Sequence, residues 1–132
     1  GWCYAAKEII EVLNKIRQPF NVSGAAQKAA ITALQDEKLL EKSQNHNIKW
    51  LNFVENELAK IKDVKTYPSQ GNFILIDFLN NTKARKINEA LLEKGIILRE
   101  MSAYHLPSCL RMTIGTQKEN IKVIKSLKEL LK

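Results

Sequence analysis

An arginine inside an apolar strand pattern restricts the fold and the chemistry of this sequence more than any other feature. Residues 109–114, CLRMTI, alternate so that Leu110 and Met112 share one face of a strand, while Cys109 and Arg111 share the other. A guanidinium is always charged, and it binds carboxylate or phosphate through two parallel hydrogen bonds. Arg111 therefore needs solvent at a sheet edge, a structural carboxylate or an anionic ligand.

A second arginine follows a neighbouring apolar segment. Gly95 interrupts a helical pattern, and residues 96–98 form an Ile-rich run that predicts a strand with Arg99 near its end. The loop that joins this strand to the next contains Pro107. Two arginines on adjacent strands suggest a small anionic substrate, whereas strand periodicity alone favours solvated arginines or arginines paired with structural carboxylates.

The rest of the chain reads as helices and one further strand. Apolar residues at helical spacing predict helices over residues 6–16, 37–62, 82–94 and 117–132. A further alanine-rich helix follows Ser23, a predicted N-cap, and Thr82 and Thr116 are predicted N-caps of later helices. Glu119 would complete a capping box with Thr116, and the apolar run 73–78 predicts a covered strand. This order predicts an α+β fold with a small, mostly antiparallel sheet covered by helices.

Composition excludes several classes of protein. The chain has 132 residues, 45% hydrophobic and 27% charged, which suits one modest core. No apolar run approaches the ~20 residues of a membrane span, and no signal-peptide pattern is visible. The net charge of +7 comes from lysines scattered among acidic residues, so we expect no nucleic-acid partner. Cys3 and Cys109 have no metal-binding spacing, which favours a reducing cytoplasm and no metal.

No local catalytic motif is present. The sequence contains no P-loop, no His-Glu-x-x-His and no Gly-x-Ser-x-Gly. The two histidines have no spacing that would build a triad, and His46 fits an exposed position on a helix. The residues alone therefore predict an anion-binding α+β domain.

Four stretches, in this order, resemble the C-terminal part of histidinol-phosphate aminotransferases: NVSGAAQKAA, SQGNFILIDF, GIILRE and LRMTIGT. The most specific are RQPFNVS at residues 17–23 and LRMTIGT at residues 110–116. Those enzymes depend on pyridoxal 5'-phosphate (PLP) and have the fold type I of aspartate aminotransferase. The resemblance implies that residues 1–36 end a large domain, that residues 37–62 form a long connecting helix, and that residues 63–132 form the small C-terminal domain.

The resemblance also implies roles for individual residues. Arg111 would pair with the substrate carboxylate, or with the substrate phosphate in the other half-reaction, and Arg99 would be a second anion-binding arginine. Asn72 and Tyr104 would line the substrate cleft, although Asn72 also fits a turn, and Tyr104 and His105 also fit loop packing. The implied substrates are amino acids and 2-oxo acids: glutamate or 2-oxoglutarate, and the phosphorylated imidazole compounds of histidine biosynthesis.

The resemblance further implies that the lysine that binds PLP in the family is absent from this chain. Residues 1–6 resemble the family segment that follows that lysine. We therefore expect no catalytic residue here, no binding of PLP by this chain alone, no activity alone, and a homodimeric full enzyme. The chain could be cut from a full enzyme, could work with a separate N-terminal chain that carries the lysine, or could be a remnant. The alternative function is a non-catalytic fragment that binds anions or a partner protein.

Overall fold

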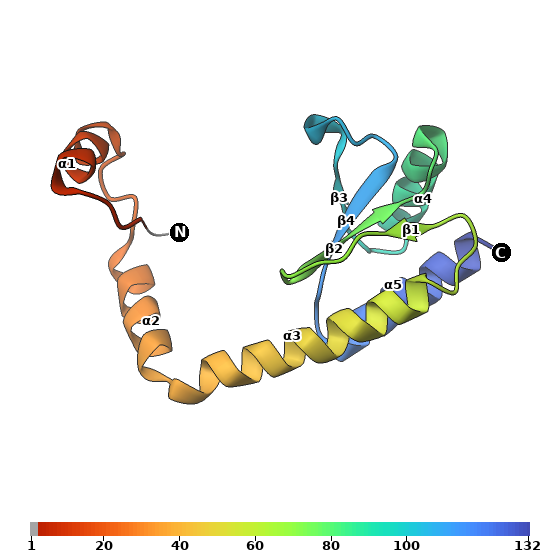
Figure 1. The fold of residues 1–132 in the computed structure, drawn as a ribbon, viewed down its shortest axis with the longest axis horizontal. Coiled ribbons are helices and arrows are strands. Elements are labelled where there is room, and N and C mark those ends of the chain that lie inside the picture. The colour runs from red at the N-terminus through yellow and green to blue at the C-terminus, as the bar shows by residue number, and fades with distance from the viewer. Residues whose placement is uncertain (1–2) are drawn as a thin grey trace. The chain divides into compact units, whose positions relative to one another are not determined.

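The protein combines helices with one small antiparallel sheet (Figure 1). A computed structural model describes residues 3–132, so the predicted likeness of residues 1–6 lies partly outside the described residues. The elements are α1 (Lys7–Ile16), α2 (Gly24–Gln35), α3 (Glu37–Leu58), β1 (Lys65–Thr66), β2 (Phe73–Asp77), α4 (Asn81–Glu93), β3 (Arg99–Glu100), the 3-10 helix η1 (Ser102–Tyr104), β4 (Cys109–Thr113) and α5 (Gln117–Leu130). The strand order is β1-β2-β4-β3, antiparallel throughout. The predicted α+β class is confirmed.

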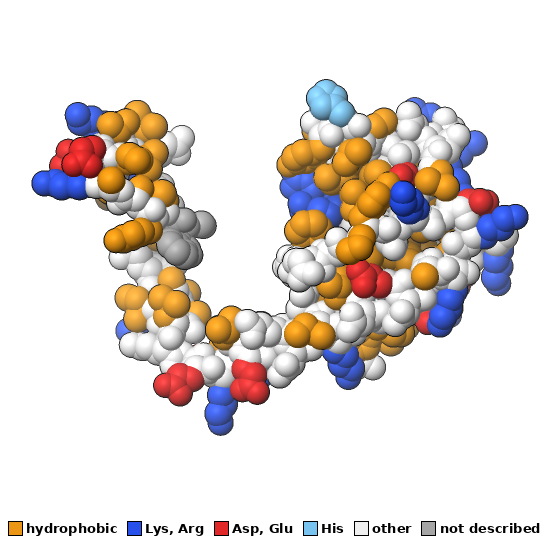
Figure 2. Space-filling model, in the orientation of Figure 1, with side chains coloured by type: hydrophobic (Ala, Val, Ile, Leu, Met, Phe, Trp, Pro, Cys, Tyr) orange, Lys and Arg blue, Asp and Glu red, His pale blue; other side chains and the backbone are white. Residues whose placement is uncertain are grey.

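The chain divides into two compact units, Gly1–Leu40 and Glu41–Lys132. In the first unit, α2 begins after Ser23, whose side-chain oxygen accepts a hydrogen bond from the Ala26 N–H at 3.2 Å, as predicted. Neither α1 nor α2 has a buried residue. Phe20 and Leu34 are 98% and 87% exposed, and Figure 2 shows hydrophobic side chains on the surface of both helices. This unit therefore exposes large apolar side chains on its surface, to an extent that is unusual for a folded domain.

The core of the second unit lies between one face of the sheet and helices α3, α4 and α5. Every one of these elements contributes buried apolar side chains, among them Val54, Leu58, Ile74, Ile76, Leu91, Leu110, Met112, Ile124 and Leu127. Burial alternates along β2 and β4 because successive strand side chains point to opposite faces. We call the sheet face opposite this core the open face; it carries Phe73, Leu75, Arg99 and Arg111.

Two predicted element boundaries are wrong. Residues 96–98 are extended but pair with no strand among the described residues, and β3 is only Arg99–Glu100. Ile96 and Leu98 are buried in the core while Ile97 is 83% exposed. Residues 96–98 are therefore apolar because two of them pack in the core, and not because they pair in the sheet. Similarly, α3 ends at Leu58 instead of residue 62, because the chain turns there and returns Ile61 to the core.

The N-terminus of α4 also differs from its prediction. Asn80, and not Thr82, is the N-cap: its side-chain oxygen accepts a hydrogen bond from the Lys83 N–H at 2.9 Å. Thr82 lies inside the first turn of the helix. The predicted cap of α5 is confirmed, since Thr116 and Glu119 form a capping box.

The cap at Asn80 leads to a test by substitution. We expect Asn80→Ala to lower the free energy of unfolding by about 1 kcal/mol, because the freed N–H group of the first turn loses its partner. Thr82→Ala, two residues along the chain, should change it by less than about 0.5 kcal/mol. Urea denaturation of both variants measures the difference, and equal losses would contradict the assignment of Asn80 as the cap.

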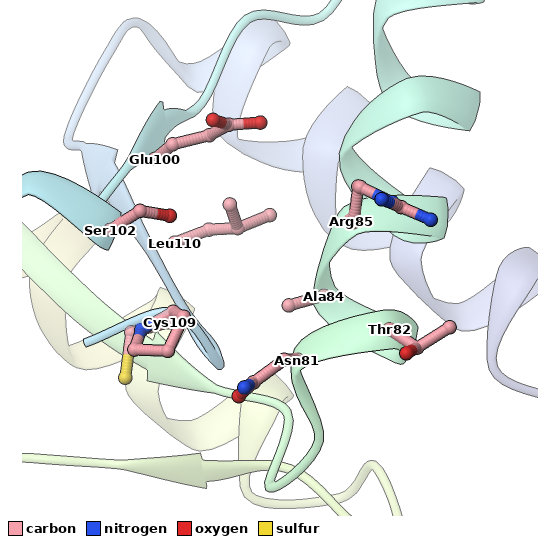
Figure 3. Close-up of a pocket in the computed structure, with 9 residues that line it drawn as sticks. Asn81, Thr82, Ala84, Arg85, Glu100, Ser102, Cys109 and Leu110 are labelled. Carbon is pink, nitrogen blue, oxygen red and sulfur yellow. The ribbon is translucent and has the colours of Figure 1, made fainter. Parts of the chain in front are cut away.

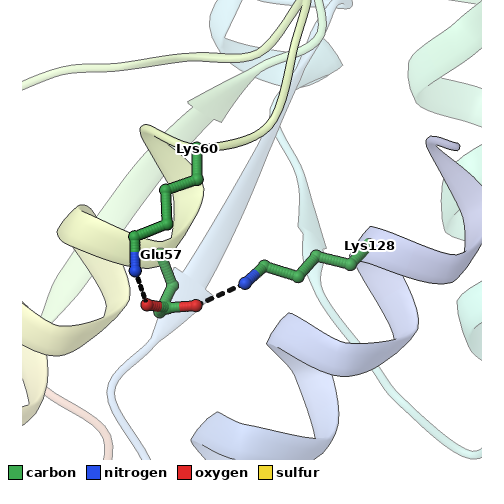
Figure 4. Close-up of polar contacts among 3 residues, drawn as sticks. All are labelled: Glu57, Lys60 and Lys128. Carbon is green, nitrogen blue, oxygen red and sulfur yellow. Dashed lines mark hydrogen bonds and ion pairs between the residues drawn. The ribbon is translucent and has the colours of Figure 1, made fainter.

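Glu57 joins α3 to α5. Its carboxylate accepts hydrogen bonds from Lys128 of α5 and from Lys60 (Figure 4). These two ammonium groups, Lys128 first, hold the pKa of the Glu57 carboxyl below its usual value. The side chain of Glu57 is only 19% exposed, so the pair is partly shielded from solvent.

The lowered pKa of Glu57 predicts a pH dependence. Because the folded-state pKa lies below the unfolded-state pKa, this carboxylate stabilises the fold above the unfolded-state value and loses that effect as the pH falls through the folded-state value. We expect Glu57→Gln to lower Tm at about pH 7, with the difference from wild type shrinking towards about pH 2. Glu55→Gln is the control on the same helix, because Glu55 makes no ion pair with residues 3–132. A constant difference at all pH values would refute the role of the charge.

The described part of the chain shows neither a membrane-spanning helix nor a cluster of metal-binding side chains. No helix within residues 3–132 has both the length and the apolar character needed to cross a membrane. Over the same residues, no three His, Cys, Asp or Glu side chains are grouped so that they could hold a metal ion.

Candidate anion-binding site

Arg99 and Arg111 face each other across two neighbouring strands. They form a directly opposed pair in the ladder between β3 and β4, on the open face of the sheet. Like charges opposite each other in an antiparallel pair destabilise a sheet. Neither guanidinium makes an ion pair with a carboxylate of residues 3–132, and the buried Nε of Arg111 has no hydrogen-bond partner there. Two arginines side by side without a carboxylate partner make this part of the open face a candidate site for an anion.

An aromatic ring accompanies each arginine. The guanidinium of Arg111 lies 5.2 Å from the centroid of the Phe73 ring, and that of Arg99 lies 5.8 Å from the Tyr104 ring. Arg99 also donates a hydrogen bond to the Tyr104 hydroxyl at 3.4 Å. The structure thus brings Tyr104 to Arg99, whereas the neighbouring His105 is exposed and lies outside this group. Cation–π contacts hold a guanidinium in place without cancelling its charge.

A cavity of about 680 Å³ adjoins the two arginines. It is lined by both guanidinium-bearing residues, by the extended segment 95–98 and by residues of α5 that include Glu119 and Lys122. Residues 96–98, which line it, do not continue the ladder with β4. The Glu119 carboxylate is engaged by the N–H and hydroxyl of Thr116, which hold its pKa below the usual value. The volume of this cavity is in the range of small-molecule sites, but part of its lining, Met112 and Val123, belongs to the core side of the sheet and not to the open face.

Asn72 lies elsewhere. It lines a separate hollow of about 430 Å³ together with His46 and Asn47 of α3, and its backbone carbonyl accepts a hydrogen bond from the Ile114 N–H at 2.8 Å. The structure therefore does not bring Asn72 into the cavity of the two arginines. His46 donates from Nε2 to the Gly115 carbonyl at 2.9 Å, a contact between residues too far apart in sequence for any local pattern to indicate.

A third, smaller hollow lies between α4 and the edge of the sheet formed by β3 and β4, with Cys109 among its lining residues (Figure 3). Its volume is about 230 Å³, with Arg85 from α4 and Glu100 from β3 on opposite sides. Strand alternation predicts Cys109 on the same face as Arg111, yet Cys109 is only 3% exposed, and the Ser108 hydroxyl lies 3.8 Å from its sulfur. Burial raises the pKa of the Cys109 thiol, and the nearby Asp77 adds to this effect. A neutral thiol is a poor nucleophile, which disfavours Cys109 as a catalytic nucleophile.

Comparison with known proteins places the chain among the aminotransferases. The sequence matches the family model "Aminotransferase class I and II" over residues 1–127. A histidinol-phosphate aminotransferase of Rhodopseudomonas palustris (strain BisB5) is 43% identical over 134 residues, covering 99% of this chain and 36% of that protein.

Solved structures agree with the sequence match. The histidinol-phosphate aminotransferase from Clostridium acetobutylicum aligns with a TM-score of 0.81 at 28% identity, over 94% of this chain and 38% of that one. The enzyme of the same name from Sinorhizobium meliloti, in complex with pyridoxal-5'-phosphate, aligns with a TM-score of 0.81 at 25% identity, over 92% of this chain and 33% of that one.

The chain therefore belongs to the class I and II aminotransferase family. Its relatives include histidinol-phosphate aminotransferases, so the resemblance seen in the sequence is confirmed. The chain spans about a third of the length of the relatives that it matches.

Proposed function

We propose that this chain supplies the substrate-binding part of a PLP-dependent aminotransferase that acts on histidinol phosphate and glutamate, or on their oxo counterparts. Arg111 and Arg99 bind the anionic group of the substrate, a carboxylate in one half-reaction and a phosphate in the other. The observation that carries the proposal is the directly opposed Arg99–Arg111 pair, which no carboxylate of residues 3–132 neutralises.

The chemistry of the pair suits such substrates. A guanidinium fork matches the two oxygens of a carboxylate or phosphate, and an anion between two arginines relieves their repulsion. A held anion fixes the orientation of the rest of the substrate, which is how positioning lowers a reaction barrier. Tyr104 supports Arg99 through its hydroxyl. Asn72 contributes to a cleft only if its separate hollow joins that cleft in the complete enzyme.

The described residues do not fit PLP itself. When bound, this cofactor serves as an electron sink for transamination, and in the family it is held by a lysine. No lysine among residues 3–132 is buried. The lysine at the arginine cavity, Lys122, donates from Nζ to the Lys94 carbonyl at 3.0 Å. We therefore assign to this chain the recognition of a substrate anion, and not the chemistry of the cofactor.

The proposal extends to the organisation of the enzyme. Residues 1–36 would complete a large PLP-binding domain, residues 37–62 would connect it to the small domain, and residues 63–132 would form the small domain. The large domain, with the lysine, would come from elsewhere in the same polypeptide or from a separate N-terminal chain. The complete enzyme would be a homodimer in the cytoplasm. The exposed apolar side chains of α1 and α2 fit this arrangement, because such surfaces usually pack against other protein.

Isothermal titration calorimetry tests the proposed site directly. We expect the chain to bind inorganic phosphate and glutarate saturably, with one site each, and each ligand to compete with the other. Sodium chloride at matched ionic strength is the control for non-specific screening. If neither anion binds saturably, the proposed substrate site is wrong.

The second candidate function is a non-catalytic module that binds anions or a partner protein. It is favoured by the exposed apolar faces of α1 and α2, which suit a docking role equally well. Such a module would bind many phosphates weakly, without saturation at one site and with strong dependence on salt. The same titration, repeated at two ionic strengths, separates the two functions.

A further inference from the structure

We propose that Phe73 is the positioning residue of Arg111, and that Gly71 is a glycine so that the Phe73 ring can take this place. This inference rests on the proposed function, since it concerns the arginine that would bind the substrate anion. It assigns a role to an aromatic residue and to a turn glycine that do not themselves contact the anion.

The first observation is the contact between ring and guanidinium. The Arg111 guanidinium makes no ion pair with residues 3–132 and its buried Nε has no hydrogen-bond partner there, whereas the centroid of the Phe73 ring lies 5.2 Å from it. Phe73 and Arg111 belong to adjacent strands and both point to the open face. A long, flexible side chain without polar partners is held by packing alone, so the ring decides where the guanidinium lies.

The second observation is the fit of the ring against the turn before β2. A Cβ atom at Gly71 would lie 3.0 Å from Cε1 and 3.3 Å from Cδ1 of Phe73. A side chain at this position would therefore require the ring to shift by at least a few tenths of an ångström. Gly71 does not have a positive φ, so backbone conformation alone does not require glycine there. The close approach of the ring supplies the reason.

The third observation is that the turn itself is anchored. Asn47 of α3 donates from Nδ2 to the Gly71 carbonyl at 3.1 Å, and the Gly71 N–H donates to the Ser69 hydroxyl at 3.2 Å. The turn is thus fixed to the long helix, the ring is fixed against the turn, and the guanidinium lies over the ring. Rigid support of this kind lowers the cost of ordering Arg111 when an anion binds.

The test compares variants of the full chain in calorimetric titrations with inorganic phosphate. We expect Phe73→Leu and Gly71→Ala to weaken phosphate binding by about three- to tenfold, and Phe73→Tyr, which keeps a ring of the same size, to retain most of it. Tyr67→Leu is the matched control: it removes another ring that contacts a cation, Lys65 at 4.8 Å, away from the arginines. Circular dichroism verifies that each variant is folded.

A second readout needs no anion. In a nitrogen–proton NMR spectrum the Arg111 Nε–Hε signal should lie upfield in the wild type because of the aromatic ring, and should move downfield in Phe73→Leu and Gly71→Ala but not in Tyr67→Leu. Unchanged Arg111 signals in Phe73→Leu, or phosphate binding equal to wild type, would overturn the role of Phe73. Equal weakening by Phe73→Leu and Phe73→Tyr would also overturn it, since an aromatic ring would then not be what matters. Absence of phosphate binding in the wild type would instead refute the proposed function.

Discussion

Arg111→Ala should remove most of the affinity of the chain for phosphate and glutarate. Charge-assisted hydrogen bonds to a guanidinium contribute about 1.5–3 kcal/mol each, so losing a bidentate pair, about 3 kcal/mol or more, should weaken binding by roughly 150-fold or more. Arg111→Lys should recover part of this loss, because an ammonium retains the charge but not the planar fork. Calorimetric titration of the three proteins with either anion measures the effect.

The control for Arg111 is an arginine outside the site. Arg85 lies on the exposed surface of α4 and pairs loosely with Glu89 at 3.8 Å, so Arg85→Ala removes the same net charge without touching the open face of the sheet. We expect at most a twofold loss for this variant, from long-range electrostatics. Equal losses of phosphate affinity for Arg85→Ala and Arg111→Ala would mean that binding depends on the overall charge of the chain and not on a specific site.

Leu58→Ala should lower the free energy of unfolding more than either Asn80→Ala or Glu57→Gln. Leu58 is fully buried at the end of α3 and belongs to the core beneath the sheet. Removing its side chain forfeits apolar burial and leaves a cavity, for which about 2.5–5 kcal/mol of unfolding free energy is the usual loss. A domain of this size has only about 5–15 kcal/mol in total, so thermal and urea unfolding should both shift clearly.

A leucine on the same helix serves as the control. Leu40 is 66% exposed, and Leu40→Ala should cost less than about 0.5–1 kcal/mol because little surface becomes newly exposed to water. A large loss for Leu40→Ala would indicate that this part of α3 is covered in solution. A small loss for Leu58→Ala would contradict the core described for the second unit.

Local patterns predicted much of this fold because they depend on neighbouring residues. The caps at Ser23 and Thr116 follow from side chains that reach back a few positions. Alternation in residues 109–114 correctly separated the buried Leu110 from the half-buried Arg111. Gly95 does end the preceding helix, with a φ of 68° that favours glycine.

Features that depend on tertiary contacts could not be predicted in this way. Both Asn80 and Thr82 are acceptable capping residues, and only the course of the chain selects Asn80. The buried Ile96 and Leu98 fit a paired strand or an unpaired extended segment equally well. The ring of Phe73 under Arg111 joins two strands that are distant in sequence, so no spacing could indicate it.

The sequence likewise predicted only part of the candidate site. Adjacent strands predict that Arg99 and Arg111 lie near each other, and the ladder makes them direct opposites. Asn72, which the family resemblance assigns to the same cleft, lies in a different hollow. That these residues bind substrate stays a prediction, which the titrations with phosphate and glutarate test.

The most direct test of the central claim is an NMR titration of the arginine side chains with phosphate. The Nε–Hε signals of Arg99 and Arg111 should shift together and saturate at the same phosphate concentration, while that of Arg85 stays in place. This result would establish the opposed arginines as one anion site. If the signals of Arg99 and Arg111 do not move, or move in proportion to ionic strength like that of Arg85, the pair is not a substrate site and the proposed function is wrong.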